Sequence, residues 1–190
     1  MSRWILMLVL VGTLIGCSKK SEVEKPPEDA SSAAQAACFS TGDEGSCNQF
    51  LQQAYKGSEQ DKQRAFAAAS TACEQQNAHA CLFLAILTEK GEGTAADKAK
   101  AAGLYEKACS GGNTEACVSL SGMYEKGEGV LTDPRKSLEL LLIACKGSNA
   151  TGCYLAGLTL LDSDDPSIKQ GGLAALRKAC DLGDKDACKS

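Results

Sequence analysis

The chain has 190 residues and a formal net charge of −4, with 44% apolar but only 5% aromatic residues. This length accommodates one domain and a targeting segment, and the shortage of aromatic side chains favours helices packed through Ala and Leu over a β-sandwich. Lysine and arginine are scattered rather than clustered, which argues against nucleic acid as a partner. Eleven cysteines indicate either a disulfide framework or thiolate metal sites.

Residues 1–16 have the features of a bacterial lipoprotein signal peptide. A positive charge at Arg3 precedes an apolar run, residues 5–11, which is too short to persist as a membrane-spanning helix. The segment ends in Leu-Ile-Gly before Cys17, which resembles the lipobox of bacterial lipoproteins, whose cysteine is acylated and becomes the new N-terminus. The alternative is a plain secretory signal followed by an incidental cysteine. The lipobox resemblance implies a membrane anchor at Cys17.

Residues 17–30 are predicted to form a flexible tether behind that anchor. They are rich in Ser, Lys, Glu and Pro and show no apolar periodicity. In Gram-negative lipoproteins an aspartate directly after the acylated cysteine tends to retain the protein in the inner membrane, and here that position holds Ser18. The resemblance therefore implies a location at the periplasmic face of the outer membrane.

The ten cysteines after Cys17 recur as five pairs at a nearly constant interval. The first members of successive pairs are 35, 36, 36 and 35 residues apart, and residues 80–115 match residues 116–151 at 15 of 36 positions without a gap. Such a period is typical of a solenoid of helix-pair units, here predicted over residues 31–190. The pairs are Cys38 and Cys47, Cys73 and Cys81, Cys109 and Cys117, Cys145 and Cys153, and Cys180 and Cys188.

Each unit is predicted to contain two helices. In the second unit the first helix spans residues 80–90 and ends at Gly91, and the second helix runs to Cys109. The first and fourth units lack the Gly-Glu-Gly turn between their helices, as expected of end units that face solvent. The second helices of units two, three and four are predicted to begin after an N-capping aspartate, at Asp97, Asp133 and Asp165.

The motifs Ala-Cys-x2-Leu, Glu-Lys-Gly-Glu-Gly, an aspartate four residues later and Lys-Ala-Cys resemble the Sel-like repeat family. This family is related to the tetratricopeptide repeat but has a slightly longer unit, and the resemblance covers about residues 31–190. The cysteine on each side of every inter-unit loop is similar to the Hcp-type cysteine-rich secreted proteins. The resemblance implies an all-α fold, a right-handed α/α solenoid cross-linked by disulfides.

Two disulfide pairings are open, because the start of the first helix and the end of the second lie at the same edge of an antiparallel pair. Pairing across each loop, such as Cys109 with Cys117, uses all ten cysteines at separations of eight or nine residues. Pairing within a unit, such as Cys81 with Cys109, gives uneven separations and would leave Cys38 and Cys188 without partners. The loop pairing is favoured, and the pairing within units is the alternative.

No catalytic residue, metal site or cofactor is predicted. No serine has a lysine three residues later, as a serine β-lactamase or penicillin-binding site requires. His79, expected just before its helix and exposed, is the only histidine, and Cys-x2-Cys knuckles are absent. The family resemblance itself implies one alternative activity, since some Hcp-type proteins are described as penicillin-binding and carry a β-lactamase label. That alternative assigns no residue of this chain.

The favoured function is a non-catalytic scaffold whose first helices line a concave surface for a peptide or protein partner. On each first helix, one face lies opposite the stripe that contains Leu84. For the apolar residues of this face, packing against neighbouring units is the favoured alternative. The candidate binding residues are His79, Phe83, Ile86 and Lys90 in unit two, Ser119 and Lys126 in unit three with Gly122 between them, and Leu155 and Leu158 in unit four.

Overall fold

The computed structural model describes residues 30–189, apart from 42–45, 47–48, 51–52 and 54–55. The predicted signal peptide, Cys17 and all but the last residue of the predicted tether lie outside the described residues. Within the described ranges, all regular structure is helical, as the sequence predicts. None of these helices has the length and apolar character needed to cross a membrane.

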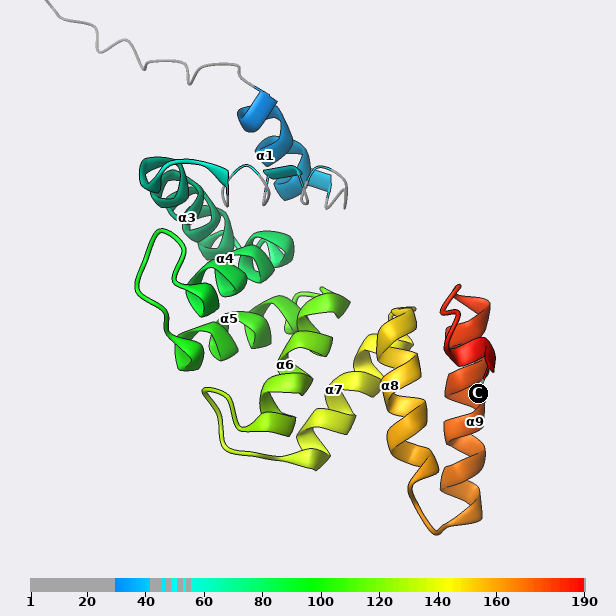
Figure 1. The fold of residues 1–190 in the computed structure, drawn as a ribbon. Coiled ribbons are helices and arrows are strands. Elements are labelled where there is room, and N and C mark those ends of the chain that lie inside the picture. The colour runs from blue at the N-terminus through cyan, green and yellow to red at the C-terminus, as the bar shows by residue number, and fades with distance from the viewer. Residues whose placement is uncertain (1–29, 42–45, 47–48, 51–52, 54–55, 190) are drawn as a thin grey trace, which may run out of the picture.

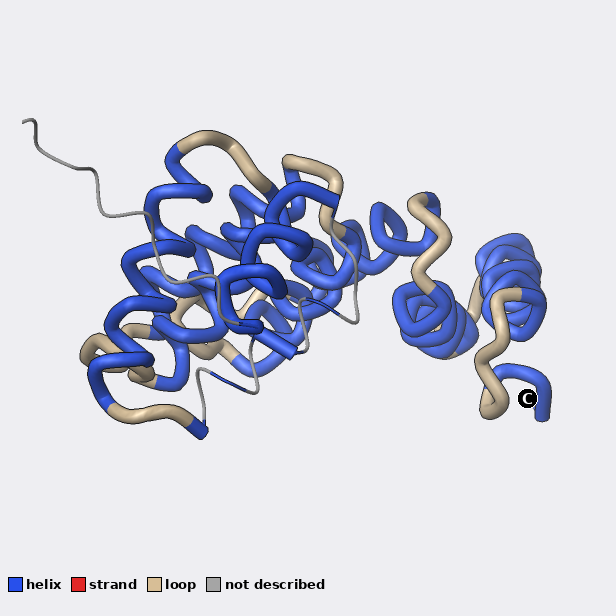
Figure 2. The backbone as a smooth tube through the Cα atoms, turned by 90° about the horizontal axis from the view of Figure 1, so that it is seen from above, coloured by secondary structure: helices blue, strands red, loops and turns tan. Residues whose placement is uncertain are grey.

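The helices follow one another as pairs along a single array, with α1 near one end and the C-terminus at the other (Figures 1 and 2). The pairs are α4 with α5, α6 with α7, and α8 with α9, and each first helix also packs on the second helix before it. The elements are α1 (Ala30–Thr41), α3 (Glu59–Glu74), α4 (Ala78–Lys90), α5 (Lys98–Ser110), α6 (Thr114–Lys126), α7 (Pro134–Lys146), α8 (Ala150–Leu161), α9 (Pro166–Asp181) and the 3-10 turn η1 (Ala187–Lys189).

Helix α4 begins two residues earlier than predicted. The side chain of Asn77 accepts a hydrogen bond from the backbone N–H of Ala80, so Asn77 is the N-cap and the helix begins at Ala78. His79 therefore lies inside the helix rather than before it, which corrects the prediction. The end of α4 is as predicted, because Gly91 adopts the left-handed backbone conformation, with φ of 76°, that closes a helix.

The second helices of the last three pairs have the predicted aspartate caps. The carboxylate of Asp97 accepts from the backbone N–H of Lys100, and Asp133 and Asp165 cap α7 and α9 in the same way. A proline follows Asp133 and Asp165 at the first helical position, where its missing N–H leaves no intrahelical hydrogen bond unmade. Local sequence therefore determines where these three helices start.

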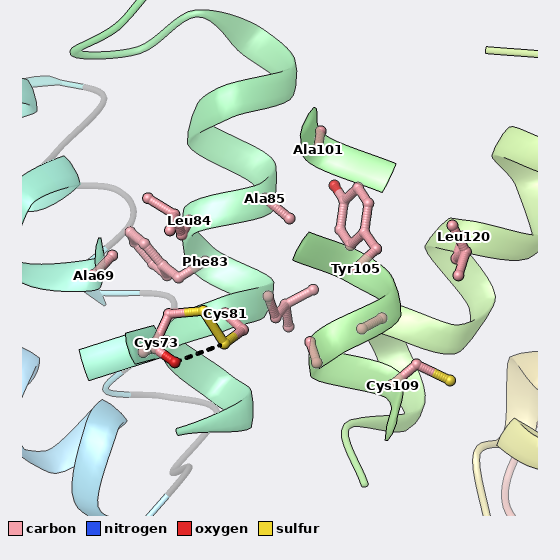
Figure 3. Packing of buried hydrophobic residues seen from close by; sticks show 14 of the residues in the cluster. Ala69, Cys73, Cys81, Phe83, Leu84, Ala85, Ala101, Tyr105, Cys109 and Leu120 are labelled. Carbon is pink, nitrogen blue, oxygen red and sulfur yellow. Dashed lines mark hydrogen bonds between the residues drawn. A yellow bond between two sulfur atoms is a disulfide. The ribbon is translucent and has the colours of Figure 1, made fainter. Parts of the chain in front are cut away.

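The core is built mostly from small side chains. Ala69, Ala85 and Ala101 are buried, as are the larger side chains of Tyr105 and Leu120 (Figure 3). One cluster of buried residues runs from Phe50 to Ala144, and a second, much smaller one lies in the last pair. The close crossings that alanine permits explain how a chain with few aromatic residues buries a packed core.

Among the described residues, four disulfides tie the helices together across the loops. Each joins the last turn of a second helix to the first turn of the next helix, eight residues on, with Cα atoms 4.3 to 4.8 Å apart. The bonds are Cys73–Cys81, which Figure 3 shows, Cys109–Cys117, Cys145–Cys153 and Cys180–Cys188. Cys81 is therefore bonded to Cys73 and not, as in the alternative pairing, to Cys109. Cys38 is buried, and its expected partner Cys47 lies outside the described residues.

Candidate interaction surface

The Gly-Glu-Gly turns join successive units. The carboxylate of Glu92 forms an ion pair with Lys62 of the preceding second helix, at 2.5 Å, and that of Glu128 pairs with Lys98, at 2.9 Å. The hydrogen bond with Glu92 raises the pKa of Lys62, and the hydrogen bond from Lys98 lowers the pKa of Glu128. Contacts between units therefore explain why the Gly-Glu-Gly turn recurs.

The glycine that follows each of these glutamates allows the turn to touch the preceding helix. A Cβ atom on Gly93 would lie 2.5 Å from the carbonyl oxygen of Lys62, and one on Gly129 would lie 2.4 Å from that of Lys98. Real Cβ atoms do not approach backbone atoms so closely. Each turn is thus packed directly onto the first turn of the preceding second helix.

Three asparagines for which the sequence predicts no role form a second link between units. While its side-chain oxygen caps α6, the Nδ2 atom of Asn113 lies 3.2 Å from Nδ1 of His79. Asn149 caps α8 and donates to the hydroxyl of Thr114, at 3.3 Å, and Asn77 donates to the backbone carbonyl of Phe39. Each amide therefore uses one end for its own helix and the other for the preceding unit.

His79 is accordingly a structural residue. It is half-buried, and the only donor on the facing amide of Asn113 is Nδ2, because the oxygen of that amide accepts from the backbone N–H of Ala116. Nδ1 of His79 therefore accepts this hydrogen bond. The expectation of an exposed histidine before the helix is wrong on both counts.

Phe83 also differs from its place among the candidate binding residues. Only 2% of its surface is exposed, since its ring stacks on Phe50 at 4.8 Å between centroids and meets Phe39 edge-on at 6.3 Å. Ile86, one turn further along α4, is half-buried against the same core cluster. These aromatic residues of unit one cover α4 at this point, so packing, the favoured alternative, holds for Phe83 and for much of Ile86.

The other candidate residues lie on the side of the array formed by the first helices, which we call the inner face. Ser119 and Leu155 are half-buried, and Leu158 is 42% exposed. The exposed side chains of Lys90 and Lys126 lie at the ends of α4 and α6. Because α6 and α8 also contact each other, their candidate residues belong to one continuous surface.

An open position lies at the centre of the inner face. Gly122 in α6 is half-buried, yet a Cβ atom built there would meet no atom within 4 Å. The equivalent positions of the neighbouring units hold Ile86 and Leu158, 36 residues before and after. The absent side chain therefore leaves open space at this position of α6, which we call the notch.

The alternative hydrolytic activity finds no support among the described residues. No group of three or more His, Cys, Asp or Glu side chains among them is placed to hold a metal ion. The serine-to-lysine spacing of a β-lactamase is absent from the whole sequence, and none of the observed contacts supports that alternative activity.

Comparisons with known proteins identify the repeat. Residues 78–113 and 114–149 each match the Sel1 repeat model, whereas no curated protein sequence matches the chain. A Sel1 repeat protein from Oxalobacter formigenes matches with a TM-score of 0.62 and 22% identity, over 74% of this chain and 55% of that one. This chain thus spans about half the length of that relative.

Two further solved structures share the fold. Cysteine-rich protein B of Helicobacter pylori matches with a TM-score of 0.57 and 25% identity, over 66% of this chain and 91% of that one. A protective antigen of uropathogenic Escherichia coli strains that displays an SLR fold matches with a TM-score of 0.60 and 22% identity, over 83% of this chain and 39% of that one. The likeness to a cysteine-rich protein and the four disulfides are both consistent with an extracytoplasmic location.

Proposed function

Since this chain carries two Sel1 repeats in a disulfide-linked all-α solenoid, we propose that it is a non-catalytic scaffold that holds a peptide or protein partner on its inner face. The partner lies across α6 and α8 and inserts an apolar side chain at Gly122. Extended concave surfaces of stacked helix pairs are the usual binding sites of repeat proteins. The open position at Gly122 is the observation that carries this proposal.

The surroundings of the notch support an apolar anchor with polar contacts around it. Leu155 and Leu158 offer apolar surface on α8, whereas the hydroxyl of Ser119 and the ammonium of Lys126 border it on α6. Side chains that fill a pocket surrounded by polar groups commonly dominate the binding free energy of such interfaces. The notch is therefore the place where one substitution has the largest effect on binding.

Gly122→Trp is expected to abolish capture of the partner without loss of stability. The indole would occupy the notch, and replacing an open helical glycine removes the entropic cost of about 0.5 to 1 kcal/mol that glycine carries in a helix. The measurement is an affinity capture from cell-envelope extract with the full, oxidised chain, with bound proteins compared by mass spectrometry.

Gly103→Trp is the matched control, because Gly103 is a helical glycine with the same open surroundings but lies in α5, a second helix. This variant should capture the same proteins as the unmodified chain. Equal capture by both tryptophan variants would show that the notch is not the binding site. Loss of binding in both would point to a surface other than the inner face.

We further propose that the scaffold is a lipoprotein anchored through Cys17 at the periplasmic face of the outer membrane. Support comes from the sequence before Cys17 and from the extracytoplasmic location that the disulfides indicate. Cys17→Ala should abolish incorporation of radiolabelled palmitate, whereas Ser18→Ala, next to it, should leave labelling unchanged. Palmitate incorporation that survives Cys17→Ala would contradict the anchor.

A further inference from the structure

The outer face of α9 is the one place in the described array where a second helix lacks most of its cover. Helices α3, α5 and α7 are each covered by the first helix of the next pair, namely α4, α6 and α8. Beyond α9 that position is held by η1 (Ala187–Lys189), whose N-capping residue is Asp184. Because η1 is a single turn, the rest of this face of α9 is open.

A depression of about 300 Å³ marks the open face. Its lining includes Leu173, Leu176, Cys180 and Ala187. Leu176 and Ala187 are buried, whereas Leu173 is 47% exposed, a large value for a leucine beside a pocket. The surface thus has an apolar floor and an apolar rim, as expected of a helix-binding groove.

Two opposite charges lie on the same stripe of α9. Arg177 and Asp181 both line the depression and are four residues apart, hence one helical turn apart on one face. The ion pairs found among the described residues involve neither of them. A surface that carries one cation and one anion in this order is complementary to an antiparallel copy of itself.

We propose that this face is an interface between two copies of the chain, with their α9 helices packed antiparallel about a two-fold axis. Arg177 of each copy pairs with Asp181 of the other, and the two Leu173 side chains become buried in the groove. Such an isologous contact closes on itself and yields a dimer rather than a filament. The unpaired charges of α9 select a second copy over an apolar helix of another protein.

The groove is held in place before the second copy binds. The Cys180–Cys188 disulfide fixes η1 against the end of α9, and Lys178 donates a 2.6 Å hydrogen bond to the backbone carbonyl of Cys145. Little conformational entropy is therefore lost when the copies associate. Because the contact uses α9, a second helix, rather than the first helices, dimerisation leaves the inner faces of α6 and α8 accessible and is independent of the proposed scaffold function.

Sedimentation velocity tests the dimer, with the full chain in a detergent whose micelles are density-matched to the buffer. The unmodified chain should show a concentration-dependent monomer–dimer equilibrium. Leu173→Glu should weaken the dimer at least about tenfold, because it places a carboxylate in the apolar contact. Arg177→Asp and Asp181→Arg should each weaken it, and the double swap should restore it to within about threefold, since only opposite signs across the axis matter.

Leu131→Glu is the control, because Leu131 is 90% exposed in the loop after α6, away from α9. It should leave the equilibrium unchanged, and helical circular dichroism should show that all variants are folded. A chain that stays monomeric at every concentration would overturn the proposal. So would a dimer that tolerates Leu173→Glu, or a double swap that is no tighter than the single reversals.

Discussion

Reduction of the disulfides is expected to unfold most of the array at temperatures where the oxidised chain is intact. Each described bridge closes a loop of eight residues, for which the chain-entropy model assigns about 2.5 kcal/mol. Four such bridges contribute about 10 kcal/mol, comparable to the total stability of a typical domain, about 5 to 15 kcal/mol. Thermal melting followed by far-ultraviolet circular dichroism, with and without dithiothreitol, measures the effect.

Single bridges give the matched comparison for this experiment. The pair Cys109→Ser and Cys117→Ser opens a junction inside the array, whereas Cys180→Ser and Cys188→Ser opens the one beyond α9. The inner junction should cost more, because its loss frees units on both sides. Melting curves that do not change on reduction would contradict the role of the disulfides in stability.

Gly129→Ala is expected to cost about 3 kcal/mol in the free energy of unfolding. The backbone of Gly129 has a φ of 73°, where an L side chain adds about 1 to 2 kcal/mol of strain. The new Cβ would also lie 2.4 Å from the Lys98 carbonyl, so the turn must move away, at a cost comparable to core overpacking, about 1 to 3 kcal/mol. Urea unfolding measures the difference.

Gly112→Ala separates the two contributions. Gly112 also has a left-handed backbone, with a φ of 92°, but a Cβ atom there would meet nothing within 4 Å. It should therefore cost only the strain, about 1 to 2 kcal/mol. If both alanine variants lose the same free energy of unfolding, the close packing of the Gly-Glu-Gly turn contributes nothing to stability. The recurrence of this turn would then need another explanation.

Most of the fold follows from local sequence signals. Gly91 and Asp97 act within one turn of themselves, so the end of α4 and the start of α5 were predictable. The start of α4 was misplaced because the cap is an asparagine, although Asn77, Asn113 and Asn149 recur at the repeat interval and were therefore detectable. Their second role is a hydrogen bond to the preceding unit. It depends on how the units stack, so the sequence of a single unit does not indicate it.

The candidate surface was predicted less well, because exposure depends on residues far away in the sequence. Phe83 and Leu155 occupy equivalent positions of the repeat, yet only Phe83 is covered, by Phe39 and Phe50 of a unit whose motif is degenerate. Helical periodicity assigns both residues to the same face and cannot show what covers it. The notch at Gly122 could not be predicted from the sequence for a similar reason, because the residues that surround a glycine in the fold determine how much space is open beside it.

Because each described disulfide joins the end of one unit to the start of the next, its two cysteines are eight residues apart wherever the boundary of a unit is drawn. An in-frame duplication of one 36-residue period within residues 80–151 therefore adds two cysteines that can pair with correct spacing, whichever residue it starts from. Each such duplication adds one capping asparagine, and one that includes Lys98 also adds a glutamate–lysine contact, whereas the position equivalent to Lys98 in the next unit is Pro134. A gene for such an array can grow or shrink by single periods without leaving an odd thiol, so the length of the protein can evolve with little risk to its oxidative folding.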